Sequence, residues 1–169
     1  MKSKILNTQL CNALQTNSFR QTQLVGQLDL TTNPNPAITP VTYNPSGVGG
    51  DIIPGTGLIL TDLGVADSIG DPIVDVRAAD ADAIYGVLVF DTKGGTKEIG
   101  DRITVAKVGS IIVMNSNAAI LRGAKVALVL ATPGDVVTQG AEALFGIALD
   151  KASAADDLIR IEVKAQGYV

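Results

Sequence analysis

The side chains that most often carry enzyme chemistry are scarce in this chain of 169 residues. Histidine is absent, which removes the commonest general base, the imidazole metal ligands and every Ser-His-Asp or Cys-His arrangement. The single cysteine, Cys11, lies in a polar stretch and is better interpreted as an incidental or buried thiol than as a nucleophile. A single cysteine cannot form an internal disulfide, which agrees with a reducing compartment.

Carboxylates are the remaining candidates for ion binding or acid-base catalysis. Asp75, Asp80 and Asp82 lie close together in the sequence, but the ligand spacing of a calcium loop and its terminal glutamate are missing. We therefore interpret them as part of a solvated loop. Glu142 and Glu162 form a conceivable pair, but no pattern places them together.

Five glycines between residues 47 and 57 resemble a phosphate-binding loop only superficially, because no Gly-Lys-Ser/Thr follows and no strand-to-helix context surrounds them. They are Gly47, Gly49, Gly50, Gly55 and Gly57. The sequence thus predicts no catalytic, cofactor or metal site, and we expect the chain not to be an enzyme.

The charge and hydropathy of the chain narrow its partners. A net charge of −4 gives no basic surface for nucleic acid, and no run approaches the roughly 18 consecutive apolar residues of a membrane span. The basic start, Met1 to Lys4, is followed by polar residues instead of the apolar core of a signal peptide. We expect synthesis and folding in a cytoplasm.

A strictly alternating stretch near the end of the chain predicts a half-buried β-strand. From Leu158 to Lys164, apolar and charged residues take turns, so Ile161 should face the core while Arg160 and Glu162 face solvent or a neighbour. A shorter β-type run, Gly146 to Leu149, precedes it across a small polar turn. The unit is a strand, a loop and a second strand.

The same unit occurs earlier in the chain. Residues 83–89 match residues 143–149 at an offset of 60 positions (143 minus 83), and Ile103 to Val105 corresponds to Ile159 to Ile161. Two copies are too few for a solenoid, so we interpret them as two halves of one β-domain.

Short β-type runs punctuated by glycine, proline and asparagine turns continue from residue 51 to residue 169. This texture predicts an all-β domain of short strands, either a β-sandwich or barrel-like. Both faces of residues 125–130 are apolar, which fits a central strand or a subunit interface. Residues 51–169 are the predicted β-rich domain.

Residues 1–50 have a different composition, rich in Gln, Asn and Thr and with four charged side chains. Leu6, Leu10 and Leu14 would share one face of a short helix, and four prolines follow between residues 34 and 45. The stretch predicts an extended N-terminal arm. It is either a disordered tail or linker, or an arm that orders only against a partner.

Several of these pieces together resemble the cement, or decoration, proteins of tailed-bacteriophage capsids. The similarity covers roughly residues 50–169 and rests on turn-and-strand motifs. They are Gly55 to Leu58, residues 83–91, Gly100 to Val105, Ala118 to Val126, Phe145 to Ser153 and Asp157 to Ile161. The arm before residue 50 is not covered.

The resemblance implies a structural virion protein that binds the outer surface of the shell formed by the major capsid protein and stabilises it. Its expected partners are that protein and neighbouring copies of itself, with no nucleic acid, membrane or cofactor. The alternative is a carbohydrate- or receptor-binding β-domain of a virion fibre or surface module. Such sites usually rely on exposed Trp or Tyr, and here Trp is absent and the only tyrosines are Tyr43, Tyr85 and Tyr168. A small enzyme with a β-barrel site is a weaker third possibility.

Overall fold

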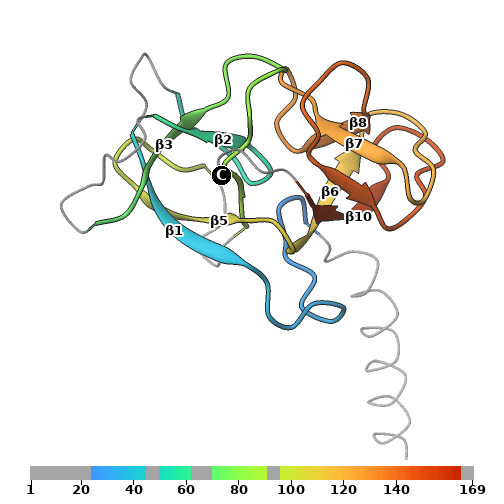
Figure 1. Cartoon of the computed structure of the whole chain (residues 1–169), viewed down its shortest axis with the longest axis horizontal. Coiled ribbons are helices and arrows are strands. Elements are labelled where there is room, and N and C mark those ends of the chain that lie inside the picture. Colours follow the sequence, from blue (N-terminus) through green and yellow to red (C-terminus); the bar gives the residue numbers. More distant parts are fainter. Residues whose placement is uncertain (1–23, 45–49, 62–69, 91–95, 165–169) are drawn as a thin grey trace, which may run out of the picture.

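The computed structural model describes residues 24–44, 50–61, 70–90 and 96–164, and the regular elements of these residues are all β-strands (Figure 1). The first five are β1 (Ile38–Tyr43), β2 (Gly57–Leu60), β3 (Ile73–Val76), β4 (Gly86–Leu88) and β5 (Arg102–Ala106). The second five are β6 (Ile111–Ser116), β7 (Lys125–Leu128), β8 (Asp135–Thr138), β9 (Gly146–Ala148) and β10 (Leu158–Val163). The predicted all-β class is confirmed.

Each set of five strands closes into its own small barrel. The orders are β1-β3-β2-β4-β5 and β10-β6-β8-β7-β9, and the two barrels lie side by side in Figure 1. The two halves predicted from the sequence are therefore two closed barrels, and the barrel-like alternative holds over the sandwich. Closure pairs the strands around each barrel and leaves few open edges.

The two barrels share one pairing scheme. β1 pairs antiparallel with β5 and parallel with β3, as β6 pairs with β10 and β8. The pairing of β2 with β3 and β4 is matched in the same way by β7 with β8 and β9. The register makes Gly86 equivalent to Gly146, which is the offset of 60 predicted from the sequence (146 minus 86). The sequence repeat is a repeat of structure.

The two matched glycines have a steric cause. A Cβ at Gly86 would lie 3.0 Å from the carbonyl oxygen of Ala106, and one at Gly146 would lie closer still to that of Glu162. Ala106 and Glu162 are themselves equivalent, so the same close approach between neighbouring strands is made in both barrels. A side chain at either position would push the strands apart.

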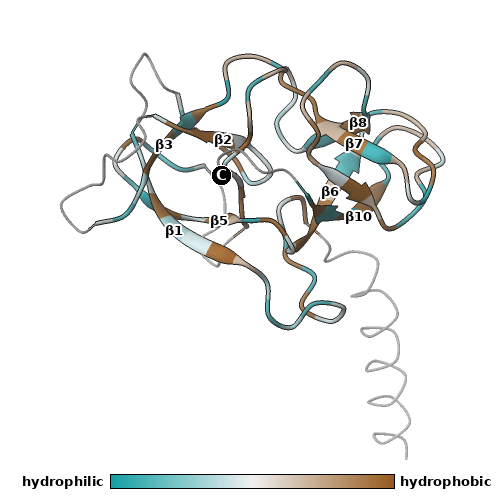
Figure 2. Cartoon of the chain, in the orientation of Figure 1, coloured by the Kyte–Doolittle hydropathy of each residue, from teal (hydrophilic) through white to brown (hydrophobic). Residues whose placement is uncertain are grey.

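The core falls into two clusters of unequal size. The first is lined by Val41, Tyr43, Ile52, Leu58, Val74, Leu88, Ile103 and Val105. The larger cluster fills the second barrel and also includes Ile84, Val87, Val89 and Ala106 from the first. The outer face of β4 and β5 is thus packed against the second barrel, and Figure 2 shows the brown, apolar residues along the strands.

The predicted register of the last strand is confirmed. Ile159, Ile161 and Val163 of β10 are buried, whereas Arg160 and Glu162 are partly exposed. The apolar run of residues 125–130 also receives its explanation, because Leu128 at the end of β7 is covered by Gly57 of the first barrel. The contact that buries it comes from the same chain.

The structure corrects the predicted boundary of the arm at residue 50. β1 lies within residues 1–50, yet it is a barrel strand that pairs with β3 and β5. The reason is the alternation of Val41 and Tyr43 with less buried neighbours, a strand signal that the surrounding prolines and polar residues hid. Residues 1–23 and 45–49, with Cys11 and Leu6, Leu10 and Leu14, lie outside the described residues. Among the described residues, no helix is long and apolar enough to span a membrane.

Candidate functional site

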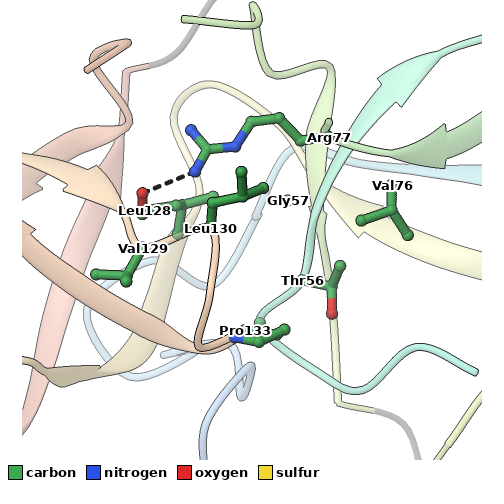
Figure 3. Close-up of a pocket in the computed structure, with 9 residues that line it drawn as sticks. Thr56, Gly57, Val76, Arg77, Leu128, Val129, Leu130 and Pro133 are labelled. Carbon is green, nitrogen blue, oxygen red and sulfur yellow. Dashed lines mark hydrogen bonds between the residues drawn. The ribbon is translucent and has the colours of Figure 1, made fainter. Parts of the chain in front are cut away.

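The junction between the two barrels is the candidate site, and a buried arginine lies at its centre. Arg77 follows β3 directly and is only 3% exposed. Its Nη2 donates a hydrogen bond of 2.8 Å to the carbonyl oxygen of Leu128, which belongs to the second barrel (Figure 3). The same nitrogen lies 3.3 Å from Oδ1 of Asp80. Arg77 therefore joins the two barrels through a charge-assisted contact.

The local sequence makes room for this contact. A Cβ at Gly57 would lie 2.6 Å from Cδ1 of Leu128, so a side chain there would make the Leu128 side chain move. The N–H of Arg77 donates to the carbonyl of Gly57 at 3.2 Å, which fixes the start of its side chain beside β7. The guanidinium then donates a hydrogen bond to the carbonyl of Leu128, the last residue of β7 (Figure 3).

Three carboxylates surround the guanidinium. Burial lowers the pKa of Arg77, while the charges of Asp80, Asp82 and Glu142 act in the opposite direction. Backbone hydrogen bonds, one of them from the N–H of Gly140, hold the pKa of Glu142 below its usual value. The three negative carboxylates thus balance the positive charge of the buried Arg77.

Asp75 lies in β3 and not in a solvated loop as predicted, whereas Asp80 and Asp82 lie in the loop that follows β3. Oδ2 of Asp82 accepts hydrogen bonds from the N–H groups of Ala78 and Ala79, and Oδ1 of Asp75 accepts one from Val76. The described residues contain no group of three or more possible metal ligands.

Glu142 and Glu162, which no sequence pattern places together, have different partners in the structure. Glu142 lies at the junction, whereas Glu162 lies on β10 and forms an ion pair with Lys164. The glycines singled out near residue 55 separate into two roles. Gly55 packs against Val25 and Gly134, and Gly57 admits Leu128.

The junction offers little enclosed space. A cleft beside Arg77, lined by Gly55, Thr56, Gly57, Val76, Leu128, Val129, Leu130 and Pro133, contains about 20 Å³ (Figure 3). That is room for about one water molecule and far below the several hundred Å³ of a typical small-molecule pocket. A second, wide-open hollow lies next to it over Leu128 to Ala131, with Asp80, Asn117, Val137 and Glu142 around it.

The segment before β1 forms a strap across the second barrel, which we define as residues 24–33. The N–H of Gly26 donates to Val113 and the N–H of Val113 donates to Gln27, at 2.8 and 2.9 Å. Asp29 of the strap is bound by Arg160 of β10, which also binds Asp150. The neighbour that Arg160 was predicted to face is thus the chain's own strap.

The electrostatics of the strap favour the ionised carboxylate. Burial acts to raise the pKa of Asp29, but hydrogen bonds from Thr31, Thr32 and Arg160 outweigh it and hold the pKa well below the usual value. Asp29 is 8% exposed in its side chain, so this pairing is shielded from solvent. The strap is held by charge as well as by strand-like hydrogen bonds.

A partly buried cation, Lys107, was also not anticipated from the sequence. Nζ of Lys107 lies 3.1 Å from the centre of the Tyr85 ring and donates to the carbonyl oxygen of Tyr85 at 2.6 Å. Burial lowers the pKa of Lys107 to about 8. Neither Arg77 nor Lys107 carries a sequence signal, because each lies just outside a predicted strand and meets its partners only in the folded chain.

Comparisons by sequence assign no family to the chain. No protein-family model matches it, and no curated protein matches it. Among solved structures, it is similar to the head fiber gp8.5 N base of bacteriophage phi29, with a TM-score of 0.48 and 13% sequence identity. The similarity covers 76% of this chain and 93% of that chain.

Proposed function

We propose that the chain is a structural virion protein of a tailed bacteriophage, a capsid cement or decoration protein that binds the outer surface of the major capsid protein shell and stabilises it. The observation that carries the proposal is the resemblance of residues 50–169 to such proteins. Its motifs fall on β2, β4, β5, β7, β9 and β10 and on the turns that join them, so they span both barrels. The resemblance therefore follows the structural repeat.

The construction of the junction supports a mechanical role. A shared apolar cluster, the contact of Arg77 with Leu128 and the strap each tie the first barrel to the second. A body held in three independent ways transmits force between its two ends without a hinge. Such stiffness suits a protein that reinforces a shell.

Equivalent exposed apolar side chains give the proposal a candidate contact surface. Ile53 and Leu121 follow matching isolated bridges and are separated by 68 positions (121 minus 53), the same offset as Gly57 and Lys125 of β2 and β7. They are 43% and 71% exposed. Each barrel thus presents a large apolar side chain at the same place, as expected for attachment at two repeated points.

The test is binding to shells from which this protein has been removed, measured by co-sedimentation and by the melting temperature of the shell. Ile53→Asp and Leu121→Asp should each weaken binding and leave the melting of the free protein unchanged. Ile99→Asp is the matched control, because Ile99 is also exposed but has the small Ala155 at the equivalent position (155 minus 99 is 56). Failure of the unmodified protein to bind or stabilise the shells would refute the proposal.

The proposal gives the N-terminal arm a role in binding that can be tested separately from that of the barrels. Residues 1–23 contain Lys2, Lys4 and Arg20 and no acidic residue, so they carry +3. The remaining residues have 10 basic side chains (13 minus 3) and 17 acidic ones, a net charge of −7. We infer that the arm becomes ordered along shell subunits or neighbouring copies, mainly through its many amides and hydroxyls.

Deletion of residues 1–23 tests the arm without removing β1, which a longer deletion would destroy. The truncated chain should melt at the same temperature as the full chain but bind stripped shells more weakly. Binding of the full chain should weaken only modestly between low and high salt, because few arm charges are involved. Full-strength binding by the truncated chain would show that the barrels dock alone.

The alternative is a carbohydrate- or receptor-binding module of a fibre, and the two tyrosines that the structure describes give it little support. Tyr43 is completely buried and donates to the carbonyl of Gly50, while Tyr85 lies beneath Lys107. Neither ring is free to stack on a sugar. Binding to host-surface glycans at micromolar concentration, with no binding to shells, would favour this alternative.

A further inference from the structure

Equivalent edges of the two barrels are treated differently. β1 and β6 occupy the same place in the pairing scheme, and the register fixes which residues correspond. Ile38 is opposite Ala106, and Ile111 is opposite Glu162, the residue equivalent to Ala106 (162 minus 106 is 56). Ile38 therefore corresponds to Ile111, and Pro40 corresponds to Val113.

In the second barrel this edge is covered by the strap. The N–H of Gly26 donates to the carbonyl of Val113, the N–H of Val113 donates to Gln27, and the N–H of Asp29 donates to Ile111. Val113 supplies both a donor and an acceptor. With the strap in place, Ile111 is 8% exposed and Val113 1% exposed. The strap acts as an additional short strand.

In the first barrel, the described residues leave the same edge without a covering strand. The N–H of Thr42 donates to Pro72 beside β3, and the N–H of Tyr43 donates to Asp101 beside β5, so even-numbered residues of β1 face the β3 side. β3 pairs only with Thr42 and Tyr43, and the described part of the chain places no strand against Ile38 and Pro40. Ile38 is accordingly 49% exposed.

An open edge is a template for pairing with another chain, and the partner it fits best is its own copy. Two β1 edges related by a two-fold axis at Thr39 would run antiparallel, with Ile38 opposite the second copy's Pro40. Each such pair normally exchanges two N–H···O=C hydrogen bonds. Proline has no N–H, so half of these bonds cannot form, and its ring fills the space where the hydrogen would point.

We propose that the open edge of β1 is a latent self-pairing surface and that Pro40 keeps it closed to a second copy of this chain. Val113 at the equivalent position shows that the same fold accepts a further strand when an N–H is present. The proposal does not depend on the proposed attachment to a shell. It assigns Pro40 a role in keeping free copies apart.

The test replaces Pro40 with residues that restore the N–H. Pro40→Val should give a concentration-dependent doubling of mass in light scattering relative to the unmodified protein, with slower amide exchange at Ile38 as concentration rises. Pro40→Thr supplies the same donor with a more polar side chain and serves if the valine variant is insoluble. Adding Ile38→Lys to Pro40→Val should abolish the new association, because the two lysine charges would lie diagonally across the pairing and repel each other.

Pro34→Val is the matched control, since Pro34 is exposed but lies before β1. It should leave the mass unchanged. The proposal is overturned if folded Pro40→Val and Pro40→Thr keep the mass and the Ile38 amide exchange of the unmodified protein at every concentration. It is equally overturned if Pro34→Val associates as strongly as Pro40→Val.

Discussion

The two barrels have the same strand pairing but different surroundings, and the contrast shows what a repeated framework leaves free to vary. β6 is buried along nearly its whole length, whereas β1, its equivalent, is exposed at its start. The strap and the first barrel both cover the second barrel, while the first barrel has an open edge. The two barrels share their strand pairing, and they differ where a barrel contacts the strap or the other barrel.

Single equivalent positions show the same division. Phe145 is completely buried, but its counterpart Tyr85 (145 minus 85 is 60) is partly exposed and lies beneath Lys107. Arg160 holds the strap, whereas its counterpart Thr104 (160 minus 104 is 56) has no strap to hold. Most interior positions stay apolar, such as Ile103 with Ile159 and Val105 with Ile161, although Tyr43 is matched by Ser116.

The largest expected effect comes from breaking the shared interior. Ile161→Asp would bury a carboxylate without a partner in the larger cluster, so we expect a loss of about 3–5 kcal/mol in the free energy of unfolding. Val105→Asp, at the equivalent position, should cost a similar amount, since both side chains are completely buried. Denaturant melts measure both. A much smaller loss for Val105→Asp would mean that the first barrel opens independently.

The matched glycines give a smaller and graded effect. Gly86→Ala and Gly146→Ala each force a methyl group against a carbonyl of the adjacent strand, and overpacking of this kind costs about 1–3 kcal/mol. Gly146→Ala should be the worse of the two, because its Cβ would lie nearer to backbone atoms. Thermal melts of the two variants decide the order. Equal losses would indicate that both barrels relax by the same amount.

Asp29 tests the strap, which has no counterpart over the first barrel among the described residues. Asp29→Asn removes the charge that Arg160 binds, and a hydrogen bond to a charged group is worth about 1.5–3 kcal/mol. Since the folded pKa of Asp29 is lowered, its contribution is present above the unfolded pKa and is lost as the pH falls toward the folded value.

The stability difference between Asp29→Asn and the unmodified protein should therefore be full at pH 6 and shrink below about pH 4. Denaturant melts across this range measure it. The control is Thr104→Ala at the position equivalent to Arg160, which should cost under about 0.5 kcal/mol at either pH. A difference that stays constant with pH would show that the charge of Asp29 does not hold the strap.

Much of the framework could be predicted from the sequence, because period-two alternation and turn residues are local signals. β10, the register of Ile161 and the match of Gly86 with Gly146 were all visible there. The full repeat was hidden because its offset drifts from 73 between Ile38 and Ile111 to 56 between Ala106 and Glu162. The first copy is longer by 17 residues (73 minus 56), distributed over its loops, so no single shift aligns both copies.

The junction could not be predicted, for a different physical reason. Arg77 becomes buried only through contacts between segments far apart in the chain, such as the 51 residues that separate it from Leu128. Lys107, in the first barrel, likewise meets Tyr85 from 22 residues away. Pro40 also misled the assignment of β1, because proline inside a strand normally argues against that strand. Proline is tolerated at this position because the backbone nitrogen of residue 40 faces the edge of the sheet, where no neighbouring strand among the described residues needs a hydrogen bond from it.

Lys107 provides the finest test of the comparison, because Val163 stands at the equivalent position (163 minus 107 is 56) and is buried. Lys107→Val would make the first barrel resemble the second at this point. Burial lowers the folded pKa of Lys107 to about 8, below that of an unfolded lysine, so the unfolded chain binds more protons between these values. The unmodified protein should therefore gain stability, by roughly 1 kcal/mol, as the pH rises from 7 to 9.5, because the amine is then buried without its charge.

The valine variant lacks this group and should not show that gain, and denaturant melts at the two pH values measure the difference between the two proteins. Lys164→Val is the control, since Lys164 is an exposed lysine beside Glu162 and its replacement should leave the pH gain in place. An identical pH dependence in the Lys107→Val variant and the unmodified protein would show that Lys107 keeps its charge in solvent and that Tyr85 does not bury it.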